Sequence, residues 1–207
     1  MGITIHYKGS IKDKSLITQL QDEMSDISQI MDWRYEIWNE DQSLPFSASI
    51  VSTPNGARIE GHIPLRGITI HVDPEIEPFN LLFNPKAQLT TFMQEILKHD
   101  GTFAKDFAWI SVKTQYGDVN AHIGIIKLLR YLKKKYIPDL EVRDEGEYWE
   151  TNDKERLLER RGFLFTKMSQ LENALASMKP KNAISTDELV DKIEAILRKF
   201  LQRGKGS

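Results

Sequence analysis

Three residues whose types suit metal binding lie two positions apart in the segment HVDPEIE, residues 71–77. His71, Asp73 and Glu75 would lie on one side of an extended strand. Imidazole and carboxylate groups are ligands for zinc, manganese and iron. Pro74 interrupts regular strand geometry, and no H-x-H or H-E-x-x-H motif accompanies the segment. The alternative interpretation is therefore a solvated strand end leading into an acidic loop.

A second histidine, His122, lies one turn into a predicted helix and on the side of Ile125 and Ile126. At that place it could act as a general base near the helix N-terminus, or join His71 and Asp73 as a third metal ligand. The alternative is a buried imidazole that is satisfied by a backbone carbonyl. Both interpretations place His122 on the apolar side of the helix.

Carboxylates are dense in EVRDEGEYWETND, residues 141–153, which we call the acidic-aromatic segment. Glu145 and Glu147 are its candidates for acid–base catalysis or for holding a divalent ion. The alternative is a turn at Gly146, followed by a helix whose first turn favours acids because they complement its dipole. Aromatic residues beside these carboxylates, Trp149 among them, are also typical of recognition surfaces.

Several function classes are excluded or disfavoured by what the sequence lacks. It has no cysteine, which excludes disulfides, thiol nucleophiles and thiolate metal sites. No phosphate-binding glycine loop and no G-x-S-x-G motif occurs. A net charge of −2 argues against nucleic-acid binding. The longest apolar stretch, 123–129, is broken by Gly124 and Lys127, so we expect no membrane span and a cytoplasmic location.

The hydrophobic periodicity predicts two β-α-β units. The first comprises residues 3–8, 15–31 and 34–39, and the second comprises residues 107–113, 118–136 and 140–144. Between them, Asn55-Gly56 predicts a central hairpin, two further strands follow at 67–73 and 79–84, and a short helix follows at 89–97. We therefore expect an α+β fold in which one mixed or antiparallel sheet carries the long helices mainly on one face.

The pentapeptide GITIH occurs at residues 2–6 and again at 67–71. Different sequences follow the two copies, so we interpret the repeat as two strands with one pattern and not as a duplicated site. In both strands the isoleucines face one way, whereas threonine and histidine face the other. The polar face is predicted to be open to a ligand or to be covered by C-terminal helices. The residues predicted to contact a ligand or partner are His6, Trp109, Lys113, Arg143 and Trp149.

The C-terminal part, residues 151–207, differs from the α+β domain predicted for residues 1–150. Apolar residues between 157 and 178 are spaced nearly as in a heptad seam. Pro180 ends that helix, and Ser185 with Glu188 forms a capping box for another. We expect a helical hairpin that packs on the body or on a second subunit, and the seam favours a homodimer.

Two functions follow from these patterns. The first is a cytosolic, non-enzymatic protein without a cofactor, which binds a protein or a small molecule through its polar sheet face or the acidic-aromatic segment. The alternative is a small metal-assisted hydrolase in which His71, Asp73 and His122 converge with Glu145 or Glu147 around a divalent ion. Proximity of the His71 and His122 side chains would favour the hydrolase.

Overall fold

A computed structural model describes the backbone of residues 3–54, 56–103 and 108–177 and, within α5, the side chains of residues 154–163, 166 and 169. The chain divides into two compact units. The larger, residues 2–158, is called the body here, and residues 159–207 together with Met1 form the other. No helix in the described part of the chain has the length and apolar character that crossing a bilayer requires.

Residues 4–39 form a strand, a helix and a second strand, as their periodicity predicts. β1 spans Thr4–Lys8, α1 spans Ile17–Ile30 after the short 3-10 helix η1 (Lys14–Leu16), and β2 spans Arg34–Asn39. The side chain of Asp13 caps η1 by accepting a hydrogen bond from Ser15 N at 2.8 Å. α1 buries Ile17, Leu20 and Met24, which follow the helical spacing of its apolar face.

In the part of the chain that the structure describes, all paired strands are antiparallel, and they form three hydrogen-bonded sheets. The first has the order β8-β1-β9 (β8 Ile110–Lys113, β9 Glu141–Asp144). The second has the order β2-β5-β6-β7 (β5 Arg66–His71, β6 Phe79–Phe83, β7 Leu89–Thr90). The third is the hairpin of β3 (Ser49–Thr53) and β4 (Gly56–Glu60). The α+β class predicted from the sequence is thus confirmed.

The strand order differs from the expected single sheet with a central hairpin. β1 pairs with β8 and β9, whereas β2 pairs with β5, so the two strands that flank α1 are not neighbours. β8 and β9 are both antiparallel to β1 and hence parallel to each other, with α3 (Val119–Lys135) as the crossover. The predicted hairpin, β3 with β4, forms its own two-stranded sheet. Alternation predicts a strand, but partner choice depends on tertiary contacts.

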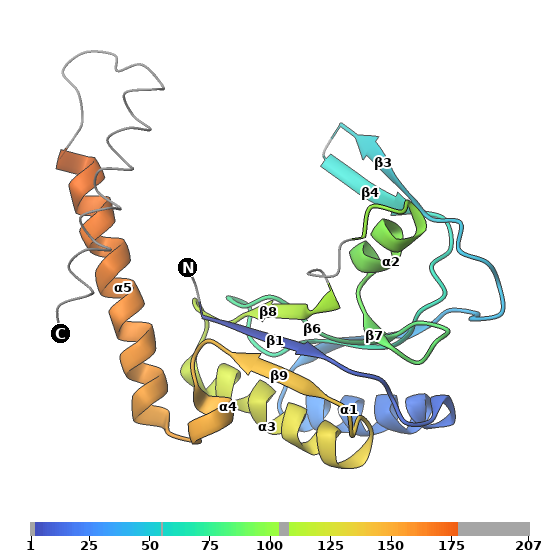
Figure 1. The fold of residues 1–207 in the computed structure, drawn as a ribbon, viewed down its shortest axis with the longest axis horizontal. Coiled ribbons are helices and arrows are strands. Elements are labelled where there is room, and N and C mark those ends of the chain that lie inside the picture. The colour runs from blue at the N-terminus through green and yellow to red at the C-terminus, as the bar shows by residue number, and fades with distance from the viewer. Residues whose placement is uncertain (1–2, 55, 104–107, 178–207) are drawn as a thin grey trace. The chain divides into compact units, whose positions relative to one another are not determined.

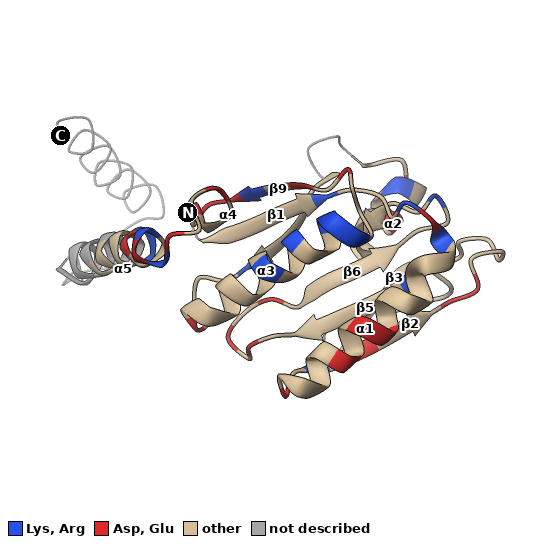
Figure 2. Cartoon of the chain, turned by 90° about the horizontal axis from the view of Figure 1, so that it is seen from below, with Lys and Arg blue, Asp and Glu red and all other residues tan. Residues whose placement is uncertain are grey.

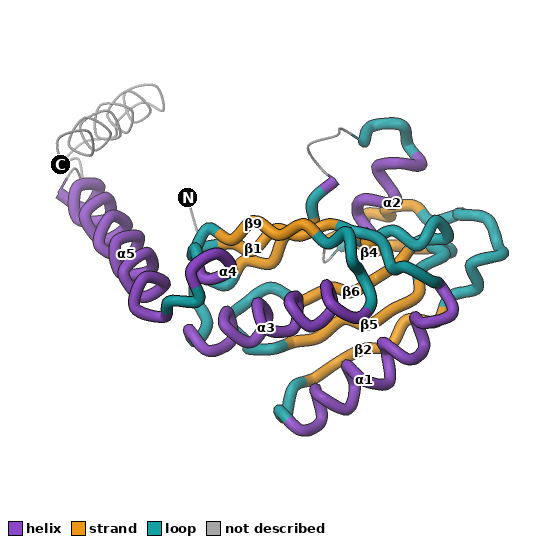
Figure 3. The backbone as a smooth tube through the Cα atoms, turned by 60° about the horizontal axis from the view of Figure 1, so that its bottom comes forward, coloured by secondary structure: helices purple, strands orange, loops and turns teal. Residues whose placement is uncertain are grey.

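The long helices α1 and α3 lie on one side of the strands, whereas α2 (Phe92–His99) and the β3–β4 hairpin lie on the other (Figure 1). Figures 2 and 3 show the two long helices side by side across the strands. Lys135 of α3 forms an ion pair with Glu23 of α1, and Tyr131 donates to the same carboxylate at 2.5 Å. Desolvation alone would raise the pKa of Glu23, but the hydrogen bonds that its carboxylate accepts, those from Lys135 and Tyr131 foremost, outweigh it and lower that pKa to about 2.

Backbone hydrogen bonds and one buried tyrosine join the first two sheets. Leu89 N donates to Gly9 O at 2.9 Å, and Glu77 N donates to Lys113 O at 3.2 Å. The hydroxyl of Tyr7 donates to Asn80 O at 2.7 Å and accepts from Asn80 N at 3.2 Å. The β8-β1-β9 and β2-β5-β6-β7 sheets therefore belong to one packed body.

After β9 the chain forms the short helix α4 (Tyr148–Thr151) and the long helix α5 (Lys154–Ser177). Leu157, the first residue of the predicted seam, is fully buried and packs near Gly146 in the body. The other seam side chains, the helix predicted after Ser185 and the proposed hairpin lie outside the described residues. The homodimer therefore stays a prediction.

Candidate functional site

The period-two alternation of β1 produces one buried and one open side of the β8-β1-β9 sheet. Ile5 and Tyr7 are fully buried, whereas His6 and Lys8 between and after them are half-buried. The register places His6 opposite Ser111 of β8 and opposite Arg143 of β9. We call this surface the open face, and it carries His6, Lys8, Trp109, Ser111, Glu141, Arg143 and Glu145.

Trp109, just before β8, interacts with cations from two other strands. The Lys8 Nζ atom lies 4.7 Å from its ring centroid, and the Arg143 guanidinium carbon lies 4.3 Å from it. Both distances are within the range of a cation–π interaction. Lys8 also pairs with Glu141 at 3.0 Å. An aromatic ring thus lies beside two positive groups, one of which is balanced by a neighbouring carboxylate.

His6 lies between a hydroxyl and a carboxylate on the same face. Its Nδ1 atom is 2.7 Å from the Ser111 hydroxyl oxygen, and its Nε2 atom is 3.8 Å from Glu145 Oε1. The second distance exceeds hydrogen-bond length. The other oxygen of Glu145 accepts from Thr4 N at 2.9 Å. Glu145 therefore does not orient the imidazole as the acid of a catalytic triad does.

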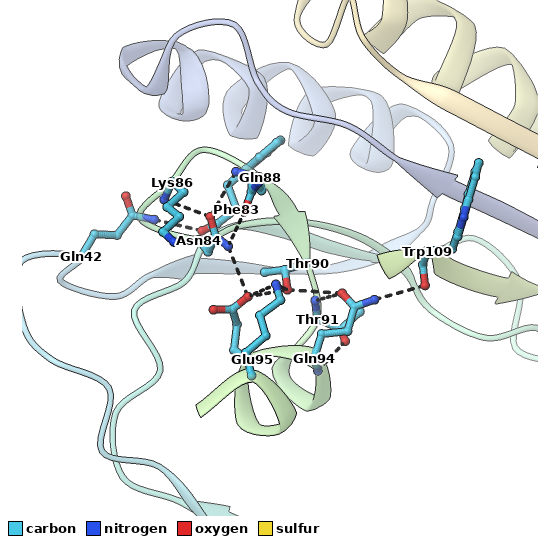
Figure 4. Close-up of polar contacts among 11 residues, drawn as sticks. Gln42, Phe83, Asn84, Lys86, Gln88, Thr90, Thr91, Gln94, Glu95 and Trp109 are labelled. Atoms are coloured by element: carbon cyan, nitrogen blue, oxygen red, sulfur yellow. Dashed lines mark hydrogen bonds and ion pairs between the residues drawn. The ribbon is translucent and has the colours of Figure 1, made fainter. Parts of the chain in front are cut away.

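The α2 N-terminus holds the start of β8 in place. Thr91 and Gln94 form a capping box, in which each side chain accepts from the other residue's backbone N–H. The buried Gln94 side chain then donates from Nε2 to Trp109 O at 3.1 Å (Figure 4). This contact fixes the backbone that carries the Trp109 ring.

A polar network in and around α2 continues from Gln94. Glu95 Oε1 accepts from Lys98 Nζ at 2.6 Å and lies 2.7 Å from the Thr90 hydroxyl oxygen. Asn84 donates to the same carboxylate at 3.3 Å, which connects the network to the turn after β6 (Figure 4). These hydrogen bonds tie the Glu95 side chain of α2 to β7 and to the turn after β6.

A pocket of about 350 Å³ lies where α2 meets the ends of β1 and β9. Lys8 and Glu141 belong to both the pocket and the open face. The remaining lining residues are Gly9, Ser10, Gln88, Leu89, Gln94, Lys98, Phe103, Ala108 and Asp139. Among the lining residues that the structure describes are an apolar wall, amide and hydroxyl groups, two lysines and two carboxylates.

Comparison of the chain with protein-family models, curated proteins and solved structures gives no match. The site must therefore be interpreted from its own geometry.

The predicted metal ligands His71 and Asp73 contact different residues. The Nδ1 atom of His71 lies 3.1 Å from Arg34 Nη2, and its Nε2 atom lies 3.4 Å from Glu36 Oε1. Asp73 accepts from Glu75 N at 2.8 Å and from Asp118 N at 3.0 Å, so it positions the turn and the start of α3. Among the residues that the structure describes, no group of three or more histidines and carboxylates is arranged to hold a metal ion.

His122 belongs to a buried network and has no exposed surface. Its Nδ1 atom is 2.7 Å from the Thr114 hydroxyl oxygen, and its Nε2 atom is 3.2 Å from Asp144 Oδ2. Burial alone would raise the pKa of Asp144. The hydrogen bond and electrostatic interaction with His122, together with the N–H groups of Trp149 and Gly146, lower it below its usual value. This geometry suits a structural role because a substrate cannot reach the imidazole.

Some of the remaining predicted site residues lie on the open face, and the others lie elsewhere in the body. Lys113 lies at the far end of β8, with Nζ 5.4 Å from the Tyr116 ring centroid. Glu147 pairs with Arg156. Trp149 lies beside Arg130 of α3. Arg130 donates a hydrogen bond to the Trp149 carbonyl oxygen at 2.8 Å, and its guanidinium carbon lies 5.6 Å from the centroid of the Trp149 ring. Of the five predicted surface residues, His6, Trp109 and Arg143 come together in one cluster.

Sequence reasoning did not find the α2 residues of the pocket. The signal was available, because Thr91-x-x-Gln94 is a capping-box pattern that marks the helix start two residues after the short strand β7. Lys98 carries no comparable signal, since a lysine in the last turn of a helix is common on any surface. Its place in the pocket follows from tertiary packing alone.

Proposed function

We propose that this protein is a non-enzymatic binding module that takes a protein partner on its open face. The observation that carries the proposal is the Trp109 ring, which lies within cation–π distance of both Lys8 and Arg143. Tryptophan and arginine dominate the energy of protein interfaces when they lie near the centre of a contact. Charged pairs beside them are typical of an interface rim.

The charges on this face favour a protein over a nucleic acid. Lys8 pairs with Glu141, and Glu145 lies near His6, so basic groups and carboxylates alternate across the surface. A polyanion is bound by basic groups that lack such acidic neighbours. The adjoining pocket of about 350 Å³ offers a place for one side chain of the partner, with both polar and apolar walls.

The first experiment places a photo-crosslinking amino acid at Ser111, which is exposed on the open face opposite His6. A second chain carries it at Asp26, an exposed position on α1. We expect a defined adduct in the source cells from position 111 and not from position 26. Adducts that are the same at both positions, or absent at both, would contradict the proposal.

The partner found in the adduct is then purified and titrated calorimetrically against the full chain. Trp109→Ala should weaken binding by about thirtyfold, the effect of a hot-spot residue worth about 2 kcal/mol. Trp149→Ala is the matched control, because Trp149 is also half-buried and close to an arginine but belongs to another group. Equal affinity of Trp109→Ala and wild type would place the partner elsewhere.

A further inference from the structure

A second pocket, independent of the open face, has a different chemical character. Its volume is about 290 Å³, close to the lower end of the range for small-molecule sites. It lies between the end of β2, the chain around and after β4, and the start of α2. The lining residues are Trp38, Glu40, Ile59, Gly61, Ile63 and Phe92.

Two aromatic rings form a corner of this pocket. The ring centroids of Trp38 and Phe92 are 4.7 Å apart, and the ring planes meet at 69°. The indole N–H donates to the Thr69 hydroxyl at 3.1 Å, which fixes the ring orientation. Both rings pack against a buried cluster that contains Ile63 and Leu65. The corner is therefore formed before any ligand enters.

Glu40 is the charged residue among those six. Its side chain is 47% exposed, so the carboxylate is accessible at the rim, and its Oε2 atom lies 3.2 Å from His62 Nδ1. Its backbone N–H donates to Leu65 O at 3.1 Å, which holds the residue in place. The pocket thus combines apolar and aromatic walls with one carboxylate.

We propose that this pocket binds a methylated ammonium group, with its methyl groups against Trp38, Ile59 and Phe92 and its charge beside Glu40. Aromatic rings attract cations through their quadrupoles. Methylated ammonium groups are recognised in this way because they are weakly hydrated, so moving them from water into a pocket costs little desolvation free energy. An apolar ligand would use the walls but not the carboxylate. The shared chemistry is the trimethylammonium group, carried either by a free small molecule or by trimethyl-lysine in a protein.

The test is an NMR titration of the full chain that follows the indole N–H resonances of its four tryptophans. Trp38→Phe assigns the relevant signal. Choline is compared with 3,3-dimethylbutan-1-ol, which has the same shape without the charge. We expect choline to shift the Trp38 resonance and to bind at least about tenfold more tightly than the alcohol. Equal affinities, no binding by either compound, or a shift confined to the other indoles would overturn the proposal.

A third arm uses a short peptide with trimethyl-lysine, and its affinity relative to choline distinguishes the two sources.

Glu40→Gln keeps the shape of the side chain and should weaken binding of the better ligand by about tenfold. Glu36→Gln is the matched control, since Glu36 is also an exposed β2-region carboxylate near a histidine, at 3.4 Å from His71. Phe92→Leu keeps apolar volume but removes a ring, and it should weaken the cation more than the alcohol. A Glu40→Gln protein that binds as tightly as wild type would overturn the proposal.

Discussion

At the scale of single residues, the buried group of Thr114, His122 and Asp144 shows how catalytic residue types can serve stability. Asp144 accepts from the backbone of Gly146 at 2.7 Å and of Trp149 at 2.9 Å, besides its contact with His122. A single carboxylate therefore fixes the turn after β9 and the start of α4. The network holds this turn together, and with it the part of the chain that follows the open face.

Replacement of this carboxylate should be costly. Asp144→Asn keeps the shape but puts an amide NH₂ where an oxygen accepted, so one buried donor loses its partner. We expect a loss of about 1–3 kcal/mol in the free energy of unfolding at pH 7, measured by urea denaturation. Asp26→Asn, at an exposed position on α1, is the control and should change that free energy by less than about 0.5 kcal/mol.

The same variant should change the pH dependence of stability. Because the pKa of Asp144 is lowered in the folded state, its stabilising contribution is present above its unfolded pKa of about 4 and is lost as the pH falls below that value. Asparagine does not titrate, so Asp144→Asn should lose less stability than wild type between about pH 5 and pH 2. If Asp144→Asn lowers the free energy of unfolding by the same amount at pH 7 and at pH 3, the charge of Asp144 does not contribute to stability.

The sequence could predict the members of the open face better than those of a metal site. His6 and Lys8 share a face because alternation along a strand is fixed by backbone geometry. Convergence of His71 and His122 required two distant segments to meet, and the sequence contains no information on strand order beyond pattern and turn signals. The burial of His122 was open for the same reason, since its position beside Ile125 suited both a structural and a catalytic imidazole.

At the scale of elements, the repeated GITIH pattern acquires a physical explanation in its second copy. Gly67 has φ of +147°, and a Cβ atom built there would lie 2.0 Å from Leu81 O. Glycine is required in β5 because β6 approaches its backbone closely. The repeat was correctly interpreted as a strand pattern, but sequence alone could not reveal that glycine serves strand pairing here and not only a turn.

Gly67→Ala should therefore be severely destabilising. The strained backbone and the overlap with Leu81 O together should lower the free energy of unfolding by more than about 4 kcal/mol, which chemical denaturation would detect. Gly162→Ala in α5 is the opposite case, because nothing beyond its chain neighbours and the backbone of its own helix lies within 4 Å of the added Cβ. It should stabilise the helix by about 0.5–1 kcal/mol. A Gly67→Ala protein as stable as wild type would mean that β5 and β6 can separate without cost.

At the scale of the whole molecule, function on the open face depends on two sheets that act as one body. The face belongs to β8-β1-β9, yet the pocket beside it includes Leu89 of β7 and residues of α2, which pack with the other sheet. Tyr7 joins the two sheets from the buried side of β1, and its burial raises the pKa of its hydroxyl. Loss of the Tyr7–Asn80 contact should therefore lower the stability of both sheets and not only of the residues around Tyr7.

Tyr7→Phe tests this junction because it removes the oxygen alone. Both Asn80 O and Asn80 N then lose a partner at a partly buried position, so the free energy of unfolding should fall by about 1–3 kcal/mol. Tyr35→Phe is the control, since the Tyr35 hydroxyl accepts from Gln29 in an exposed pair, and it should cost less than about 0.5 kcal/mol.

Native-state hydrogen exchange of the Tyr7→Phe protein shows whether the two sheets unfold together. If the sheets unfold together, amides of β1 and β6 should lose equal protection, whereas faster exchange confined to β6 would show that the two sheets open separately.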